Sequence, residues 1–309
     1  MPHTAIIKAI DEYAVHDGAG SRSLVFLKGC SLRCKWCQNP ENQGFEPELW
    51  FHRSLCVHCG ACRNICPVGA VRIDDDLVRI DKSKCLGVSC SKCVGICTKK
   101  AYKVVGYSIT SAGLWRKLSQ FKPFYQQRAG GGVTLTGGEP LHHPDFAAEV
   151  LQLCQEDSIN TAIETSLYAP WNQVNEVVSH CDFIMADIKH MDSKKHIWGT
   201  GVPNEQILSN FRQLNTDFKH KIVVRIPLIP GFNDDEENIV RTAEFIKPLE
   251  HIEGLDLLPF NVYPVAKYEA LGEQWAYQGI AKQSEDYLHT LYDLAAKYSG
   301  KHCTLGGTW

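Results

Sequence analysis

Short apolar runs alternate with longer amphipathic stretches along most of the 309-residue chain. Runs rich in Val, Ile and Leu are typical of strands buried on both faces, and apolar residues spaced three or four apart are typical of helices. This alternation predicts an α/β fold in which helices cover a parallel sheet. About six strand-helix units are present where a closed barrel has eight, so we expect an open, partial (β/α)6 barrel. The expected strands are 24–27, 133–136, 161–165, 183–188, 222–229 and 255–258, and the expected helices are 114–121, 144–155, 171–178, 207–214, 236–247 and 285–298.

A cysteine-dense segment from Phe51 to about Val105 interrupts this alternation. It contains eight of the fourteen cysteines and too few apolar residues for a core of its own, so we expect it to fold around metal. The chain is therefore divided into a barrel, residues 1–50 and 106–309, and an inserted ferredoxin-like domain, residues 51–105.

The cysteines of the insert form two runs, Cys56-x2-Cys59-x2-Cys62-x3-Cys66-Pro67 and Cys85-x4-Cys90-x2-Cys93-x3-Cys97. In bacterial ferredoxins with the first spacing, the fourth cysteine of a run ligates the cluster of the other run. A zinc ribbon is the alternative, because four cysteines at such spacings also bind zinc. The crossover predicts two 4Fe-4S clusters, one on Cys56, Cys59, Cys62 and Cys97 and one on Cys66, Cys85, Cys90 and Cys93.

Three further cysteines, Cys30, Cys34 and Cys37, lie on a loop directly after the strand 24–27, where Gly29 permits a sharp exit. Soft thiolate ligands on a tight loop select an iron-sulfur cluster or zinc. Three ligands suit three corners of a four-iron cluster and leave the fourth iron open, as catalytic metal sites leave a position open for substrate. The loop is therefore the first candidate for catalysis.

A second motif, Gly137-Gly138-Glu139-Pro140, follows the strand 133–136. Two glycines at the end of a strand allow backbone amides and carbonyls to approach a ligand, because no side chain intervenes. The adjacent His142 and His143 do not have metal-ligand spacing and are interpreted as loop residues.

Polar residues also end several of the expected strands, where a buried parallel sheet does not tolerate them without a function. The carboxyl ends of such strands carry the chemistry of α/β barrels. The residues in question are Glu164, Thr165, Asp187, Lys189, Arg225 and Asn261.

The CxxxCxxC loop, with Trp36 before its last cysteine, resembles that of the radical S-adenosylmethionine (SAM) enzymes, and the Gly-Gly-Glu-Pro motif is similar to their cofactor-binding segment. Segments 16–22, 38–41, 162–166 and 187–192 resemble one subgroup, the activating enzymes of glycyl radical enzymes. The resemblance covers nearly the whole chain.

The resemblance implies a radical-generating 4Fe-4S cluster on Cys30, Cys34 and Cys37, three such clusters in all, and SAM as cofactor. It also implies a monovalent cation held by Glu164, Thr165, Asp187 and the carbonyl of Met185. The cofactor-binding positions that it implies are Trp36, Gly137, Gly138, Glu139, Glu164, Thr165, Asp187, Lys189, Arg225 and Asn261.

The implied activity is reductive cleavage of SAM, after which the 5′-deoxyadenosyl radical abstracts a glycine α-hydrogen from a partner glycyl radical enzyme. Flavodoxin or ferredoxin is the implied electron donor. Two other functions are open at this point: a radical SAM enzyme that acts on a small molecule or a peptide, and an iron-sulfur electron carrier.

Charge and hydropathy exclude other classes of protein. The net charge of −3, with both signs interspersed, provides no basic field for nucleic acid. No apolar run approaches the roughly 20 residues of a membrane span, and the N-terminus lacks an export pattern, so we expect a cytoplasmic protein with no membrane partner. A reducing compartment argues against disulfides. Cys154, Cys181 and Cys303 stand singly among apolar neighbours and are expected to be buried without chemistry.

Overall fold

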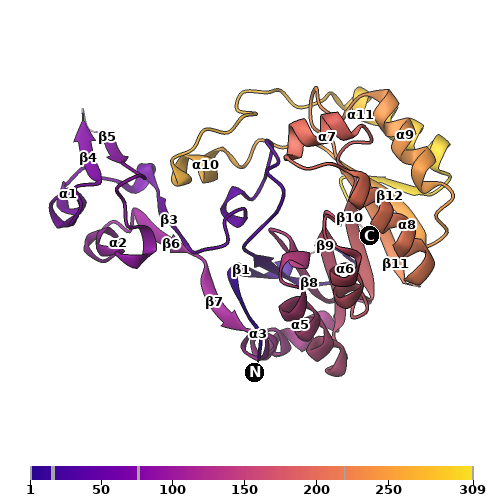
Figure 1. Cartoon of the computed structure of the whole chain (residues 1–309), viewed down its shortest axis with the longest axis horizontal. Helices are drawn as coiled ribbons and strands as arrows, with labels where there is room; N and C mark the ends of the chain where they lie inside the picture. The colour runs from indigo at the N-terminus through magenta and orange to yellow at the C-terminus, as the bar shows by residue number, and fades with distance from the viewer. Residues whose placement is uncertain (1, 15–17, 75–76, 219, 308–309) are drawn as a thin grey trace.

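The computed structural model describes residues 2–14, 18–74, 77–218 and 220–307, and within them a nine-stranded mixed sheet forms the body of the molecule (Figure 1). The strand order is β13-β12-β11-β10-β9-β8-β2-β1-β7, so β13 and β7 are the two edges and the sheet is open. All neighbours from β13 to β2 are parallel, whereas β1 pairs antiparallel with both β2 and β7. The strands are β1 (Thr4–Ala14), β2 (Arg22–Leu27), β7 (Tyr107–Thr110), β8 (Gly132–Gly137), β9 (Asn160–Thr165), β10 (Phe183–Asp187), β11 (Lys221–Pro227), β12 (Ile252–Leu258) and β13 (His302–Leu305).

Helices cover the outer face of this sheet (Figure 1). The main core lies between the two layers and combines strand residues such as Ile184 and Val224 with helix residues such as Phe211 and Leu291. The helices of the body are α3 (Ser111–Leu118), α4 (Lys122–Tyr125), α5 (Pro144–Glu156), α6 (Trp171–Val178), α7 (Ser193–Thr200), α8 (Glu205–Asp217), α9 (Glu236–Ile246), α10 (Val265–Leu271) and α11 (Glu285–Ser299).

The predicted α/β alternation is confirmed, since each of the six expected strands and six expected helices corresponds to an element of the structure. The structure adds elements that the sequence pattern did not indicate: the antiparallel strands β1 and β7, the seventh parallel strand β13, and the helices α7 and α10. The outer half of β1 is mostly exposed or half-buried, and β7 is likewise not deeply buried, so neither contains the continuous apolar run used to identify strands.

The inner face of the sheet is apolar at one end and polar at the other. Because side chains alternate along a strand, Phe183, Met185 and Asp187 of β10 share one face. Phe183 and Met185 pack with inward residues of β9 and β11 in a small buried cluster, and Asp187 pairs in register with Arg225 of β11. The polar end is the carboxyl end of the parallel strands, where the chemistry of α/β folds is found.

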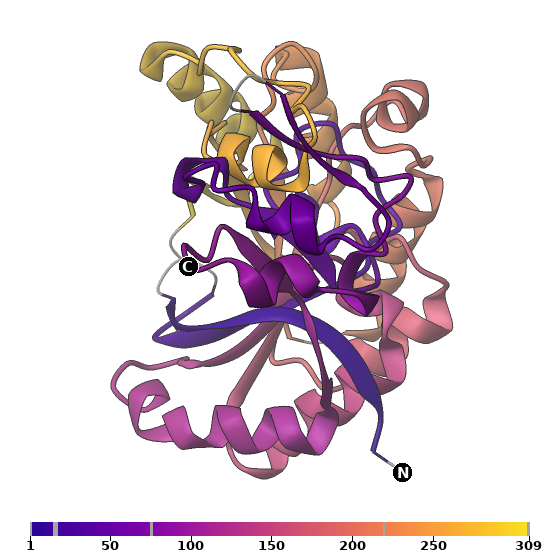
Figure 2. The same cartoon turned by 90° about the vertical axis from the view of Figure 1, so that its left-hand side faces the viewer.

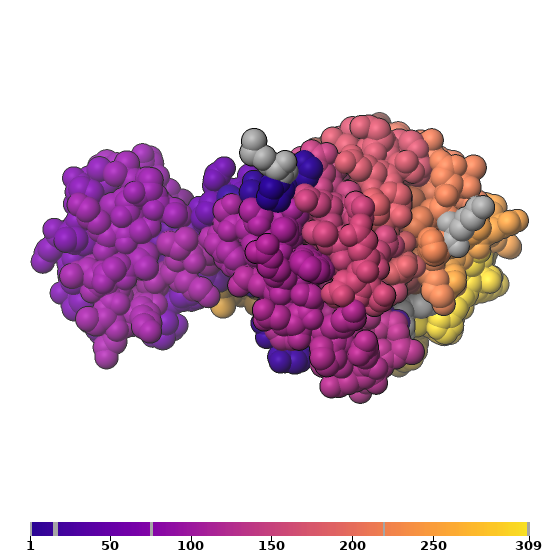
Figure 3. Space-filling view, turned by 90° about the horizontal axis from the view of Figure 1, so that it is seen from below, coloured from indigo at the N-terminus to yellow at the C-terminus, as the bar shows by residue number. Residues whose placement is uncertain are grey.

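Residues from β3 (Glu48–Phe51) to β6 (Tyr102–Val105) form a separate lobe that projects from the body (Figure 1, Figure 3). In Figure 2 this lobe faces the viewer. Strands β3 and β6 pair antiparallel and connect the lobe to the body. The expectation that this segment has no core of its own is wrong, because Phe51, Val71 and Tyr102 belong to a small buried cluster within the lobe. Its other elements are α1 (Ala61–Ile65), β4 (Val71–Asp74), β5 (Leu77–Ile80) and α2 (Lys92–Ile96), with β4 and β5 paired antiparallel.

Among the helices that the structure describes, none is both long enough and apolar enough to cross a membrane.

Candidate active site

The loop with Cys30, Cys34 and Cys37 leaves β2 and crosses the carboxyl end of the sheet, where backbone hydrogen bonds fix it. The amides of Arg33 and Lys35 donate to the carbonyls of Thr200 (2.7 Å) and Gly199 (3.0 Å) at the end of α7. Trp36 is buried against Phe232, with ring centroids 4.5 Å apart. The last turn of α7 therefore holds the middle of the cysteine loop, a contact that the sequence did not indicate.

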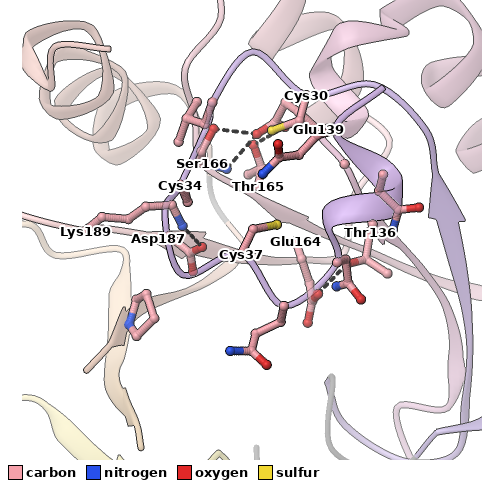
Figure 4. Close-up of a pocket in the computed structure, with 18 of the residues that line it drawn as sticks. Cys30, Cys34, Cys37, Thr136, Glu139, Glu164, Thr165, Ser166, Asp187 and Lys189 are labelled. Carbon is pink, nitrogen blue, oxygen red and sulfur yellow. Dashed lines mark hydrogen bonds and ion pairs between the residues drawn. The ribbon is translucent and has the colours of Figure 1, made fainter. Parts of the chain in front are cut away.

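One pocket of about 260 Å³ gathers most of the predicted site residues (Figure 4). This volume lies near the lower end of the usual range for small-molecule sites. Of the predicted residues, Cys30, Cys34, Trp36, Cys37, Gly137, Gly138, Glu139, Glu164, Thr165, Asp187, Lys189 and Arg225 line it.

Two predicted residues do not line this pocket. The side chain of Met185 is buried below it, with Phe183. Asn261 lies beside the cysteine loop, because Gln38 Nε2 donates to its carbonyl (3.4 Å), but its side-chain oxygen accepts from the amide of Tyr263 (3.2 Å). Residues 16 and 17, part of the segment that resembles the activating enzymes, lie outside the described residues.

The three thiols of the loop lie in a buried environment that disfavours the free thiolate. Burial raises the pKa of Cys30 to about 12 and raises the pKa values of Cys34 and Cys37 as well. Without metal these groups are neutral thiols at physiological pH. A metal ion deprotonates a coordinating thiol outright, so the set is suited to a bound cluster.

Within the described residues, no three His, Cys, Asp or Glu side chains are placed to hold one metal ion. Ligands of a single zinc ion must all approach it to about 2.0–2.3 Å, whereas a four-iron cluster distributes its thiolates over separate irons. Cys30, Cys34 and Cys37 line one pocket together.

Gly137 and Gly138 are required by the close approach of two backbone segments. Gly137 has a φ of +106°, which L side chains rarely adopt, and a Cβ at Gly138 would lie 2.2 Å from the carbonyl oxygen of Gly29. The amide of Gly138 donates to the carbonyl of Leu27 (2.8 Å), and the amide of Glu139 donates to that of Gly29 (2.8 Å). The Gly-Gly turn thus lies directly against the start of the cysteine loop.

Glu139 is a buried carboxylate that organises the neighbouring strand end. It accepts hydrogen bonds from Thr165 Oγ1 (2.6 Å), from the amide (2.8 Å) and hydroxyl (2.5 Å) of Ser166, and from the amide of Leu141 (3.2 Å). Burial raises the pKa of Glu139, and these donors oppose that shift. Glu139 is therefore turned toward the protein and fixes the ends of β8 and β9 relative to each other.

Charged pairs line the rest of the pocket. Arg225 pairs with Glu164, whose other oxygen accepts from Thr136 Oγ1 (2.5 Å). Lys189 Nζ lies 2.5 Å from Asp187 Oδ2. Burial lowers the pKa of Lys189, but the charge and the hydrogen bond of Asp187 oppose this effect, and the pKa lies above its usual range, so Lys189 is a cation.

The sequence interpretation did not assign six polar residues of the lining to the site: Gln38, Asn39, Asn42, Gln43, Thr136 and Ser166. Thr136 and Ser166 adjoin positions that the motifs identified, so the inward alternation of β8 could have indicated Thr136. Asn42 and Gln43 lie on the return of the cysteine loop, and no periodic pattern marks them.

The eight cysteines of the lobe gather around two cavities. The sets are the ones that the crossover predicts: Cys56, Cys59, Cys62 and Cys97 line one cavity, and Cys66, Cys85, Cys90 and Cys93 line the other. The same hydrogen bond occurs after the last cysteine of each run: the amide four residues later donates to its sulfur, Ala70 to Cys66 (3.3 Å) and Ala101 to Cys97 (3.3 Å). Each cavity is therefore lined by one four-cysteine set.

Two predictions about the positions of residues outside the motifs agree with the structure. Cys154, Cys181 and Cys303 are buried. His143 Nε2 bonds the carbonyl of Lys28 (2.7 Å), and His142 lies in a short 3₁₀ turn, so both are loop residues.

Two family models match this chain. Residues 118–243 match the radical SAM superfamily, and residues 49–72 match the 4Fe-4S binding domain. The second match contains the first cysteine run of the lobe, whereas the first lies downstream of the cysteine loop.

Curated relatives match nearly the full length. The chain is 39% identical over 300 residues to the choline trimethylamine-lyase activating enzyme of Oleidesulfovibrio alaskensis, covering 95% of this chain and 96% of the relative. It is 42% identical over 270 residues to the isethionate sulfite-lyase activating enzyme of Desulfovibrio desulfuricans, covering 86% of each. Among solved structures, Streptococcus suis SuiB bound to precursor peptide SuiA matches with a TM-score of 0.56 at 15% identity, over 96% of this chain and 50% of that one, which is evidence on the fold alone.

Proposed function

The chain belongs to the activating enzymes of glycyl radical enzymes, within the radical SAM superfamily, and we propose that Cys30, Cys34 and Cys37 are the residues through which it acts. One observation supports this most directly: the three cysteines, the Gly-Gly turn and the strand-end charges line a single pocket. A 4Fe-4S cluster bound there supplies the electron that cleaves SAM, and the resulting 5′-deoxyadenosyl radical takes a hydrogen atom from a glycine of the partner.

The residues around the cysteines bind and orient SAM. The backbone of Gly137 and Gly138 faces the amino group of the cofactor, with Glu139 holding the turn in place through its four donors. The Lys189 cation supplies a positive charge for the carboxylate of SAM or for a partner backbone. Trp36 forms a wall of the site, and Asn261, beside the loop, is our candidate for adenosine recognition.

We also propose a site for a monovalent cation, with Glu164, Thr165, Asp187 and the Met185 carbonyl as its ligands. Glu164 and Asp187 lie in one pocket and carry negative charge, which suits a hard cation. Each already pairs with a basic side chain, Glu164 with Arg225 and Asp187 with Lys189, so a cation there would share these carboxylates.

We propose three 4Fe-4S clusters in all, two of them in an inserted ferredoxin-like domain, residues 51–105, attached to a partial barrel of residues 1–50 and 106–309. The two four-cysteine cavities and the open parallel sheet support this division. The insert then passes electrons inward from a cytoplasmic one-electron carrier, flavodoxin or ferredoxin, because thiol ligands of this kind need a reducing compartment.

We propose a glycyl radical enzyme as the partner, without choosing one member of that class. Relatives of 35–42% identity are named for activation of a lyase that acts on choline, a sulfite-lyase and two decarboxylases. The substrate of the partner does not enter this pocket, so similarity to one of these names over another does not identify it. An adjacent gene that encodes a protein with a glycine loop near its C-terminus is the candidate partner.

The test is anaerobic incubation of the reconstituted protein with SAM, a reductant and that partner, followed by electron paramagnetic resonance (EPR) spectroscopy. We expect a glycyl radical signal on the partner that disappears when the loop glycine is replaced by alanine. Formation of 5′-deoxyadenosine without any radical on the partner, together with turnover of an added small molecule or peptide, would reject this function in favour of the alternative.

A further inference from the structure

Helix α10 contacts the end of the cysteine loop through two adjacent side chains. Lys267 Nζ donates to the carbonyl of Gln38 (2.8 Å) and to Asn39 Oδ1 (2.7 Å). Tyr268 Oη donates to the carbonyl of Cys37 itself (3.3 Å). Two consecutive backbone carbonyls, those of Cys37 and Gln38, therefore accept hydrogen bonds from this helix.

Lys267 is fixed in this position by a buried carboxylate. Glu41, on the return of the cysteine loop, is fully buried, and its Oε1 lies 3.1 Å from Lys267 Nζ and 2.7 Å from Lys8 Nζ of β1. Burial lowers the pKa of Lys267, and Glu41 opposes this shift. The carboxylate thus ties three segments together: the loop, the first strand and α10.

The other end of the same helix contacts the lobe. Ala270 and Leu271 pack with Trp50 of β3 and Val105 of β6 in a small buried cluster. Just beyond the helix, Glu273 Oε1 lies 3.1 Å from Lys82 Nζ of the lobe. Seven residues of helix therefore span from the lobe to the cysteine loop.

One of the two cysteine sets of the lobe faces this helix. A cavity of about 590 Å³ lies between the lobe and the body, and Cys85 lines it together with residues 269–273. Cys59, in the other set, is exposed. The Cys66, Cys85, Cys90 and Cys93 set is therefore the one adjacent to α10.

We propose that Lys267 and Tyr268 are positioning residues for Cys37, and that α10 couples the lobe to the cysteine loop. The inference rests on the proposed function, since it assumes a cluster on Cys30, Cys34 and Cys37. The ammonium group of Lys267 stabilises the added negative charge when that cluster is reduced, and the Tyr268 hydroxyl withdraws charge from the Cys37 carbonyl. Both effects raise the reduction potential of the cluster at this loop.

The test compares Lys267→Gln and Tyr268→Phe with the wild type, all fully reconstituted with iron. The cluster at the loop is recognised by EPR because its reduced signal changes when SAM is added. We expect its midpoint potential to become more negative in both variants, and to return toward the wild-type value in Lys267→Arg, which restores the charge. The matched controls are Lys282→Gln and Tyr263→Phe, a lysine and an exposed tyrosine outside the site that contact each other.

A further variant tests the contribution of the lobe. Leu271→Ala removes apolar contact with Trp50 and Val105 while leaving Lys267 and Tyr268 unchanged, and we expect the SAM-sensitive signal to change in this variant too. Loss of iron from the loop cluster alone in Lys267→Gln, reversed by Lys267→Arg, also supports the positioning role.

The inference is overturned if the SAM-sensitive signal and its potential are the same in Lys267→Gln, Tyr268→Phe and the wild type. An unchanged signal in Leu271→Ala alone overturns the coupling to the lobe. Failure of the proposed function is a separate outcome, because the wild type itself would then show no SAM-sensitive signal.

Discussion

At the scale of single residues, backbone approach constrains this site more tightly than side-chain chemistry does. A methyl group at Gly138 would lie 2.2 Å from the Gly29 carbonyl oxygen and 2.7 Å from that of Asn42. Gly138→Ala must therefore push the Gly-Gly turn away from the cysteine loop. We expect a loss of about 1–3 kcal/mol in the free energy of unfolding, the usual cost of overpacking, and weaker SAM binding.

Equilibrium dialysis with labelled SAM and urea unfolding measure the two effects of Gly138→Ala. Gly95→Ala is the matched control, because a Cβ there meets nothing within 4 Å and the backbone is not left-handed. Wild-type affinity for SAM in Gly138→Ala would show that the turn does not form the cofactor site.

The pH dependence of stability can be tested at His196, which is fully buried on α7, with Nδ1 bonded to the Val202 carbonyl (2.6 Å). Burial lowers the pKa of His196, so the unfolded state binds a proton more readily than the folded state does. The resulting loss of stability begins as the pH falls through the unfolded value of about 6.5 and continues down to the lower folded value. We expect His196→Gln to lose less stability than the wild type between pH 7.5 and 5.5.

Denaturant unfolding of both proteins at each pH gives this difference, with the iron content matched so that cluster loss does not contribute. Parallel pH profiles for His196→Gln and the wild type would contradict a neutral, buried His196. The same helix end accepts hydrogen bonds from Arg33 and Lys35 of the cysteine loop, so its stability matters for the site.

At the scale of elements, local patterns indicated the buried parts of the fold and missed the exposed ones. The strands β8 to β12 are mostly buried and were predicted to within three residues at each end. Strand β1 alternates only over its first residues, and α10 has seven residues, too few for its period to be visible. The contacts of α10 with both the loop and the lobe join residues more than 160 positions apart in the sequence, which no local pattern contains.

The candidate site followed from motifs rather than from periodicity. Cysteine spacing indicated all eleven proposed ligands, because ligand type and spacing are local properties. The pairs Thr136 with Glu164, and Glu139 with Ser166, join different strands and become visible only when the sheet is assembled.

The pairing of the lobe cysteines can be decided by two double variants. If the crossover holds, Cys66→Ser with Cys85→Ser removes ligands of one cluster, so about four irons should be lost. Cys62→Ser with Cys66→Ser should then disrupt two clusters and lose about eight. If each run instead binds its own cluster, the Cys66/Cys85 double variant should lose about eight irons and the Cys62/Cys66 double variant about four.

Iron and sulfide analysis of the reconstituted proteins measures the loss, and Cys154→Ser is the control because that cysteine is buried away from all three sites. Equal losses of iron in the two double variants would reject both pairings.

At the scale of the whole molecule, the candidate active site and the eight lobe cysteines lie in different parts of the structure: the pocket is in the body, and the cysteine cavities are in the lobe. The pocket lies at the carboxyl end of the parallel strands, and the lobe is attached beside it through β3, β6 and α10. The sheet is open, because its edge strands β13 and β7 do not pair with each other.

The most direct test of the central claim is cleavage of SAM by the isolated protein. Anaerobically purified, iron-reconstituted protein is incubated with dithionite and SAM, and 5′-deoxyadenosine is quantified. We expect its release from the wild type, and none from Cys30→Ala, Cys34→Ala or Cys37→Ala. Full iron content without any release, or release that persists in Cys30→Ala, would contradict the assignment of the cysteine loop as the catalytic centre.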